Sequence, residues 1–309
     1  MKTSSIIALT CSELAACTVL WDGRFNDMTT SVDLDNWSWA NQVGEYQWYI
    51  HGDGVTTDYV NLSPDYKNPA DTGSEQGVKM TLDSTAYWNG QTMRRTELIP
   101  QTTAAINAGT VWYHFSMMRE DTNAPSVNRE HQICFFESHF TEMKAGWLSG
   151  SSGTSDTNLR WMANSVSQWD TEFTAGVWHN IAYEIDFTGG TVGFWYSTGA
   201  DDLVLTVEPV SVSASSNGAD WHLGVLELPR DGRFKWRRHI LEQHHTGWHD
   251  SRQYQHPDHA ANLDDQGLDS DYDSRARNRD DIGDGTGRDD YFVSVLGGPD
   301  LNDYYSQCL

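Results

Sequence analysis

Two glutamates of the sequence lie in hydrophobic segments, where an acidic side chain is costly to bury unless it has a role. Glu97 lies in TMRRTELI (92–99) and Glu137 in HQICFFESHF (131–140). If both segments are strands, alternation places Arg95 on the face of Glu97, and Ile133 and Phe135 on the face of Glu137. An arginine lowers the pKa of a nearby carboxyl, whereas apolar surroundings raise it. We therefore expect an ionised Glu97 and a protonated Glu137.

Two carboxyls with opposed pKa values are the groups that glycoside hydrolysis needs. One carboxyl donates a proton to the leaving oxygen, and the other acts in its ionised form as base or nucleophile. The alternative for each glutamate is an ordinary structural ion pair. Whether such an enzyme would invert or retain depends on the carboxyl separation, which the sequence leaves open.

Further side chains are of the types that bind sugars. His222 lies in ADWHLGVLELPR (219–230), where it is either a structural residue or a partner for the substrate or the attacking water. Tryptophans near turn residues offer flat apolar faces for sugar rings. The predicted substrate-binding residues are Arg95, Gln132, Lys144, Trp147, His222 and Trp88.

The elements that position these residues are short strands. Runs rich in Val, Ile, Tyr, Trp and Thr are separated by Gly, Asn, Asp and Ser, and many runs alternate apolar and polar residues. The clearest runs cover 46–52, 77–83, 110–118, 131–140, 179–187, 190–197 and 220–228. No segment shows a sustained helical period. The pattern predicts an all-β fold, a β-jelly roll or two-sheet β-sandwich with a concave substrate groove.

The domain organisation follows from changes in composition. Residues 1–16 resemble a secretion signal, with Lys2 before a short apolar stretch and a small-residue cleavage site. Residues 17–298 are expected to form one catalytic domain, followed by a tail at 299–309. The segment 235–288 is too polar to form a core and interrupts this domain, either as a genuine insert or as a gene-model artefact. Strand character returns at Asp289.

Composition narrows the class of partner. The formal charge of −24 repels nucleic acid and disfavours a polyanionic substrate, whereas a neutral polymer fits. The fourteen tryptophans favour sugar binding. No apolar stretch is long enough to cross a bilayer. We expect a secreted monomer with no cofactor and no metal, in which Asn36 is a glycosylation acceptor and Cys134 is a buried free thiol.

Several long segments match a known family in order. They are CTVLWDGRF (17–25), YVNLSPDYKNP (59–69), WNGQTMRRTELIP (88–100), REHQICFFESHF (129–140), WHNIAYEIDF (178–187) and SSNGADWHLGVLELPR (215–230). Together they resemble glycoside hydrolase family 131, over about residues 17–234 and again at 289–298. The resemblance implies a jelly-roll fold and a fungal secreted enzyme that acts on β-1,3-, β-1,6- and β-1,4-linked glucans. By motif position it implies a site at Glu97 in RRTEL and Glu137 in FFESH, with His222 in DWHLG nearby.

Two other functions remain open at the level of sequence. One is a jelly-roll polysaccharide lyase that acts on uronate polymers, although glutamates facing an anionic sugar would repel it. The other is a glucan-binding lectin without activity, since jelly rolls commonly bind sugars and fold does not settle function. The paired glutamates favour the hydrolase.

Overall fold

The computed structural model describes residues 18–230, 287–294 and 307–308. All of these residues belong to one compact unit. The expected secretion signal at 1–16, nearly all of the predicted insert at 235–288 and most of the predicted tail at 299–309 lie outside the described residues. Within the described ranges, no helix has the length and apolar character that crossing a membrane requires.

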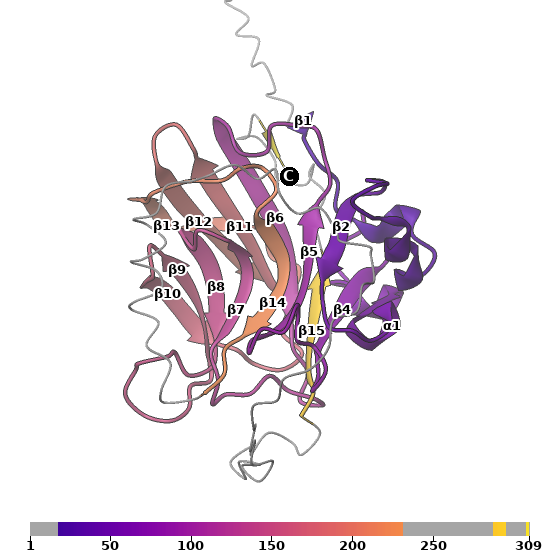
Figure 1. The fold of residues 1–309 in the computed structure, drawn as a ribbon. Coiled ribbons are helices and arrows are strands. Elements are labelled where there is room, and N and C mark those ends of the chain that lie inside the picture. Colours follow the sequence, from indigo (N-terminus) through magenta and orange to yellow (C-terminus); the bar gives the residue numbers. More distant parts are fainter. Residues whose placement is uncertain (1–17, 231–286, 295–306, 309) are drawn as a thin grey trace, which may run out of the picture. The chain divides into compact units, whose positions relative to one another are not determined.

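Two β-sheets make up the unit (Figure 1). The strands of sheet I are β1 (Thr18–Val19), β3 (Val60–Ser63), β4 (Gly77–Leu82), β6 (Thr110–Met118), β11 (His179–Asp186), β12 (Thr191–Thr198), β13 (Val204–Ser211), β15 (Asp289–Ser294) and β16 (Gln307–Cys308). Their order is β13–β12–β11–β6–β15–β4–β3, and β16 pairs with both β6 and β1.

Sheet II has the order β10–β9–β8–β7–β14–β5–β2. Its strands are β2 (Tyr46–Ile50), β5 (Arg94–Pro100), β7 (His131–Phe136), β8 (Thr141–Ala145), β9 (Asn158–Ala163), β10 (Val166–Glu172) and β14 (Trp221–Glu227). All pairings within sheet II are antiparallel. The predicted all-β sandwich is confirmed, and the seven predicted runs form β2, β4, β6, β7, β11, β12 and β14.

The helices in the described part of the chain are short and precede β4 in the sequence. They are the 3₁₀ helices η1 (Phe25–Asp27), η2 (Ser31–Asn36) and η3 (Pro64–Tyr66), and the single turn α1 (Thr56–Tyr59). Thr30 caps η2, because its hydroxyl accepts from the N–H of Val32 while the Asp33 carboxylate accepts from the N–H of Thr30. These helices lie beside β2 and β4 (Figure 1).

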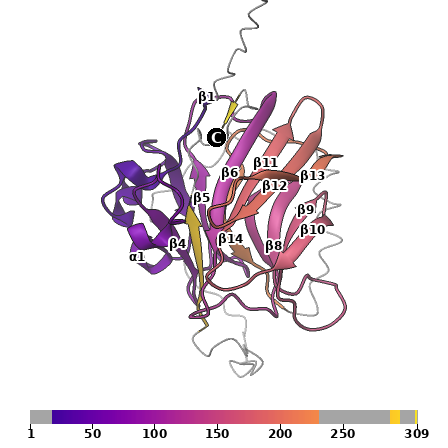
Figure 2. The same ribbon diagram turned by 180° about the vertical axis from the view of Figure 1, so that it is seen from behind.

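The strand after the predicted insert lies inside sheet I. As its return to strand character predicts, Asp289–Ser294 forms β15, which pairs with β4 on one side and β6 on the other. Every residue of β15 is buried. Both ribbon views show this yellow strand next to β4 (Figure 1 and Figure 2). Sheet I therefore depends on residues that follow the insert for one of its inner strands.

The core lies between the two sheets and consists largely of aromatic and aliphatic side chains. Trp161 of β9 stacks on Phe194 of β12, with ring centroids 4.8 Å apart, and so joins sheet II to sheet I. Leu98 of β5 and Leu223 of β14 are register partners and both belong to the core. Alternation then turns the neighbouring Glu97 to the opposite face of sheet II, away from the core.

Candidate active site

Glu97 lies on the outer face of sheet II, where it is fully buried. Both oxygens of its carboxylate contact positively charged or hydrogen-bonding partners. Arg95 Nε lies 2.6 Å from Glu97 Oε1, and Arg95 Nη2 lies 2.8 Å from Oε2. His222 Nδ1 lies 2.5 Å from the same Oε2. Burial alone would raise the pKa of Glu97, but Arg95 and His222 outweigh it and lower the pKa below its ordinary value. The expectation of an ionised Glu97 therefore fits this geometry.

Gly224 makes room for this carboxylate. It is the register partner of Glu97 across β14 and β5. A Cβ at Gly224 would lie 2.5 Å from Glu97 Cα and 2.8 Å from Glu97 Cγ, which is too close for any other residue. A glycine at this position leaves room for the side chain of Glu97, which contacts His222 on the same strand, β14.

Glu137 is the exposed member of the pair, with 60% of its side chain accessible. Its Oε2 lies 3.2 Å from His222 Nε2 and 3.7 Å from Arg95 Nη2. The partial loss of water around the carboxylate raises the pKa of Glu137, but the hydrogen bond from His222 and the positive charges of His222 and Arg95 lower it to about 2. The expectation that apolar neighbours keep Glu137 protonated is therefore wrong.

The reason for this error is a break in the strand. Cys134 has a left-handed φ of 47°, and the register of β7 against β14 shifts between His222 and Val225. Ile133 consequently points into the core, while Phe135 lies on the outer face beside His222. β7 ends at Phe136, so Glu137 follows the strand and does not alternate with Phe135.

His222 links the two carboxylates. Its ring is stacked on Phe135 at a centroid distance of 4.7 Å and an interplanar angle of 7°. Burial lowers the pKa of His222, but the charge of Glu97 and the hydrogen bond to Glu137 raise it to about 9. At neutral pH the imidazolium donates from Nδ1 to Glu97 and from Nε2 to Glu137. His222 is buried, and both of its ring nitrogens contact the glutamates.

Other predicted residues lie on the neighbouring strands. Gln132 and Lys144 are register partners on β7 and β8, and both contact Glu130. Lys144 Nζ lies 2.6 Å from Glu130 Oε1 and 3.4 Å from Glu142 Oε1. Sequence reasoning missed Glu130 and Glu142, although they flank the run 131–140 that contains Glu137. Their signal was an acidic side chain flanking or within a strand-like run, as for Glu137.

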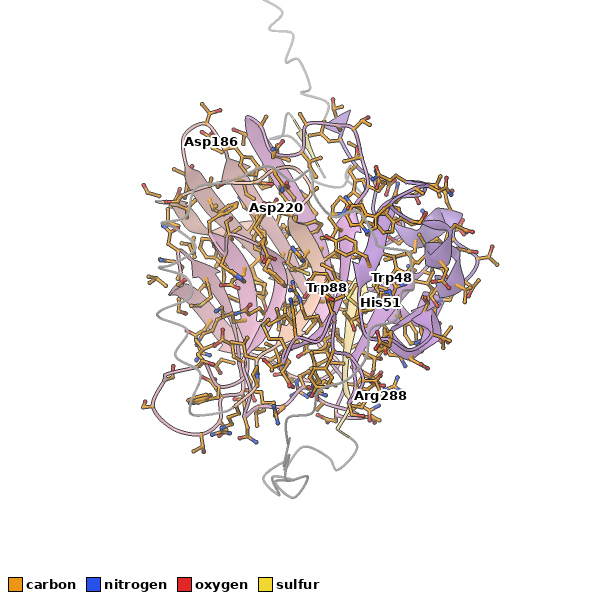
Figure 3. The ribbon with its side chains drawn as sticks, viewed as in Figure 1. Trp48, His51, Trp88, Asp186, Asp220 and Arg288 are labelled. Atoms are coloured by element: carbon orange, nitrogen blue, oxygen red, sulfur yellow. The ribbon has the colours of Figure 1, made fainter. Side chains whose placement is uncertain are left out.

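The two predicted tryptophans differ in their surroundings. Trp88 contacts the site, since the guanidinium of Arg95 lies over its ring at 5.5 Å from the centroid. Trp147 follows β8, and its ring is covered by the guanidinium of Arg230 at 5.0 Å. The side-chain view shows Trp88 near the middle of the unit, with Trp48 and His51 to its right (Figure 3).

Two sequence predictions outside the site also have a place in the structure. Asn36 is exposed at the end of η2, where a glycan could be attached, and glycosylation stays a prediction. Cys134 is a buried free thiol, as predicted, and burial raises its pKa well above the ordinary value.

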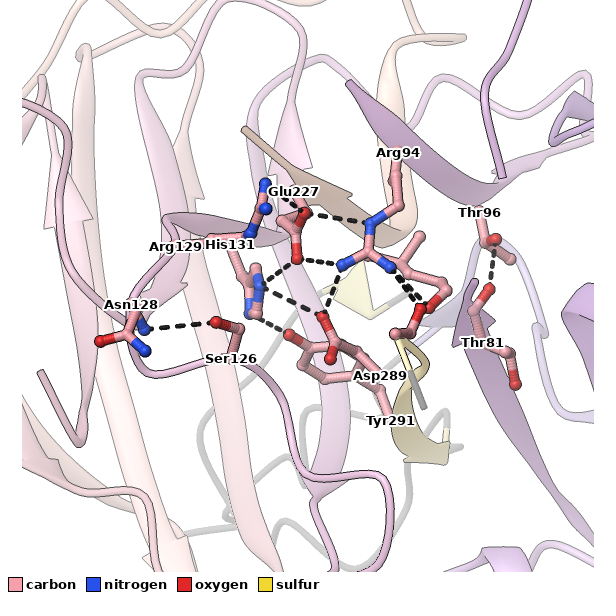
Figure 4. Close-up of polar contacts among 12 residues, drawn as sticks. Thr81, Arg94, Thr96, Ser126, Asn128, Arg129, His131, Glu227, Asp289 and Tyr291 are labelled. Carbon is pink, nitrogen blue, oxygen red and sulfur yellow. Dashed lines mark hydrogen bonds and ion pairs between the residues drawn. The ribbon is translucent and has the colours of Figure 1, made fainter. Parts of the chain in front are cut away.

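A buried polar network lies on the inner face of sheet II, behind the site (Figure 4). Arg94 Nε donates to Glu227 Oε1 at 3.0 Å, and Arg94 Nη2 lies 3.1 Å from Asp289 Oδ2. His131 Nε2 lies 3.1 Å from Glu227 Oε2, and its other ring nitrogen bonds the hydroxyl of Tyr291. The network joins β5, β7 and β14 of sheet II to β15 of sheet I. Arg94 and Glu227 directly adjoin Arg95 and Leu226 of the outer face, so the network also fixes the strands that carry the site.

His131, Glu227 and Asp289 are of the types that bind metals, and their ligand atoms lie within 4.8 Å of one another. The guanidinium of Arg94, however, contacts both carboxylates. Its positive charge occupies the place that a cation would take. We therefore interpret the three residues as part of an ion network.

Asp289 should make the stability of the fold depend on pH. Burial and the charge of Glu227 raise the pKa of Asp289 to about 8, so its carboxyl holds a proton at neutral pH. Because the unfolded chain has already released this proton, the contribution of Asp289 to stability falls as the pH rises from about 4 to about 8. Asp289→Asn should remove this pH dependence. Between the two ends of this pH range, its free energy of unfolding should therefore rise relative to that of the native chain by more than about 1 kcal/mol.

Urea denaturation at about pH 5 and about pH 9 measures this difference. Tyr291→Phe is the matched control, because it removes the hydrogen bond to His131 without removing a carboxyl. It should lower the free energy of unfolding by a similar amount at both pH values. An equal slope in Asp289→Asn and the native chain would contradict the assignment of the proton to Asp289.

Comparison with known proteins gives the family. The family model described as the glycoside hydrolase 131 catalytic N-terminal domain matches residues 19–245. A crystal structure of a family 131 β-glucanase catalytic domain from Podospora anserina is 55% identical, with a TM-score of 0.73, and covers 94% of this chain and 99% of that chain. The catalytic domain of a family 131 protein from Coprinopsis cinerea is 40% identical, with a TM-score of 0.68, and covers 93% and 97%. The curated proteins contain no match. The chain belongs to glycoside hydrolase family 131.

Proposed function

We propose that this enzyme hydrolyses β-glucans, the neutral glucose polymers with β-1,3, β-1,6 or β-1,4 linkages. The similar chain from Podospora anserina is described as a β-glucanase, and the two chains match over nearly their whole length. The observation that carries the proposal is an exposed carboxylate, Glu137, hydrogen-bonded to a buried imidazolium whose other nitrogen contacts a second carboxylate. The buried imidazolium holds a proton, and the carboxylate of Glu137 links that proton to the surface, where a polymer can reach the carboxylate.

In this proposal Glu137 is the carboxyl that contacts the substrate. Glu97 has no exposed surface, and its oxygens are taken by Arg95 and His222. A sugar ring cannot reach it without displacing one of these partners. Glu97 therefore acts through His222, because its negative charge holds the imidazole in the charged form and fixes the ring for Glu137.

The proton path follows from these contacts. The Nε2 proton of His222 moves to Glu137 Oε2, and Glu137 donates it to the glycosidic oxygen as the bond from that oxygen to C1 breaks. A water molecule adds to C1, and the proton that it loses returns through Glu137 to His222. General acid–base catalysis of this kind contributes about 10²–10⁴-fold to a rate.

Product analysis tests the proposed activity. We expect the purified protein to release saturated gluco-oligosaccharides from laminarin, mixed-linkage β-glucan or cello-oligosaccharides, read by mass spectrometry, and to leave alginate intact. The Glu137→Gln variant should bind the same glucans without cutting them. Binding without products in both proteins would replace the hydrolase with a glucan-binding lectin, and unsaturated uronates from alginate would indicate a lyase.

The cellular context is proposed on sequence grounds. Secretion, glycosylation at Asn36 and a monomeric state stay predictions. The exposure of Asn36 supports the predicted glycosylation, since an acceptor asparagine must be accessible at the surface.

A further inference from the structure

Four aromatic side chains form a continuous cluster at the β2 side of the site. Trp37 and Trp39 lie edge to face at 5.0 Å, and Tyr49 of β2 lies 5.7 Å from Trp37 and 5.0 Å from Trp39. Trp88, in the segment before β5, lies 6.0 Å from Tyr49. We call Trp37, Trp39, Tyr49 and Trp88 the aromatic shelf.

The shelf leaves a large apolar face in solvent. Trp39 is 66% exposed, which is the highest value among the large hydrophobic side chains in the described ranges. Trp37 beneath it is buried, and its indole Nε1 donates to Gln101 Oε1 at 3.0 Å. Trp37 therefore has a structural role, whereas the exposed ring of Trp39 contributes little to folding and is held in place by Trp37 and Tyr49.

The shelf is continuous with the acid pair. The guanidinium of Arg95 lies over the ring of Trp88 and bonds Glu97 on its other side. Burial raises the pKa of Tyr49, and the negative charges of Glu97 and Glu137 raise it further. The phenol of Tyr49 is therefore close enough to both carboxylates to interact with their charges. A polymer in contact with Glu137 can thus extend over these rings.

The opposite side of Glu137 has a different chemistry. The outer face of β7 and β8 carries Lys144 and Glu142, and His139 Nδ1 lies 3.0 Å from Glu142 Oε2. The ring of His139 stacks on Phe135 at 5.3 Å, and Phe135 stacks on His222. On this side the charged groups are largely buried and paired with one another, whereas the shelf presents flat apolar rings.

We propose that the aromatic shelf is a binding site for glucose units remote from the bond that is cut, and that Trp39 stacks on the face of a pyranose ring there. The axial C–H groups of a β-linked glucose unit make such a face apolar, which matches an exposed indole. This inference rests on the proposed function, because the occupant is the polymer that Glu137 cuts. The shelf makes affinity depend on chain length.

Calorimetric titration of gluco-oligosaccharides of increasing length into Glu137→Gln tests the shelf without any need for turnover. Adding Trp39→Ala should weaken the binding of the longer oligosaccharides about three- to tenfold and leave that of the disaccharide unchanged. In the active enzyme, Trp39→Ala should raise KM for the polymer more than it raises KM for short oligosaccharides. Tryptophan fluorescence should shift on binding of a long oligosaccharide, and this shift should shrink in Trp39→Ala.

Val55→Ala is the matched control, because Val55 is 65% exposed and lies at the start of α1, outside the shelf. It should change none of these quantities. Equal affinities for all lengths with and without Trp39 would overturn the proposal, even if the enzyme proves to be a β-glucanase. Length-dependent binding that Trp39→Ala abolishes would support the shelf, even if no hydrolysis were found. A change in sedimentation with no change in sugar binding would make the shelf a contact between two copies and overturn the proposal.

Discussion

Glu137→Gln should lower kcat by about 10²–10⁴-fold and leave the affinity for oligosaccharide nearly unchanged. Glutamine has the shape of glutamate but cannot pass a proton from His222 to the glycosidic oxygen. Because 60% of the side chain is exposed, the substitution should also leave the free energy of unfolding almost unaltered. Steady-state kinetics, titration calorimetry and urea denaturation on the same preparation measure the three quantities.

The companion variant Glu97→Gln separates a carboxyl that contacts the substrate from one that acts through His222. The charge of Glu97 helps to raise the pKa of His222 to about 9, so kcat/KM of the native enzyme should fall as the pH rises through that value. Without this charge His222 loses its proton at lower pH, and the alkaline fall of kcat/KM should move towards neutrality. A lower kcat with an unchanged pH profile would show that Glu97 does not act through His222.

Small carboxylates give an independent readout of the same distinction. Formate should restore part of the activity of Glu137→Ala, because the space left by the side chain opens to solvent. It should not rescue Glu97→Ala, whose cavity is closed by Arg95 and His222. Rescue of Glu97→Ala and not of Glu137→Ala would reverse the two roles.

Arg95→Met should destabilise the fold by about 3–5 kcal/mol. The substitution keeps most of the apolar stem but leaves Glu97, which is fully buried, with His222 as its one remaining charged partner. When one member of a buried ion pair is removed, the other remains buried as an uncompensated charge, which is strongly destabilising. Guanidinium or urea denaturation at neutral pH measures the loss.

A second arginine provides the control. Arg24 pairs with Asp22 through the same kind of two-pronged contact, but 43% of the Asp22 side chain is exposed. Arg24→Met should therefore cost no more than about 1 kcal/mol. Adding Glu97→Gln to Arg95→Met should recover part of the lost stability, because the unmatched charge is gone. Equal losses for the two arginine variants would show that burial of Glu97 does not determine the cost.

Most strands could be predicted from the sequence because their side chains alternate between core and outer face. The edge strands β10 and β13 were harder. Both are largely exposed, and β13 contains Pro209, which a strand tolerates at an edge. These two strands form because β10 pairs with β9 and β13 pairs with β12, and neither has a hydrophobic pattern of its own.

The candidate site was predictable in its residue types but not in its electrostatics. Alternation correctly placed Arg95 beside Glu97, since both lie on one regular strand. It failed at Glu137, because the left-handed conformation of Cys134 cannot be inferred from neighbouring apolar residues. The contact of His222 with Glu97 joins residues 125 positions apart, and the shelf joins Trp37 to Trp88. Only the folded sheets bring such groups together.

The position of β15 has a consequence for how the protein is made. As the chain leaves the ribosome, β4 and β6 are synthesised long before the strand that separates them, so both present unpaired edges while translation continues. Those edges can pair with other nascent chains until residues 289–294 emerge. The same order defines the shortest usable expression fragment. A fragment cut at residue 245, where the family match ends, would lack β15 and the carboxyl group that pairs with Arg94 from across the sandwich.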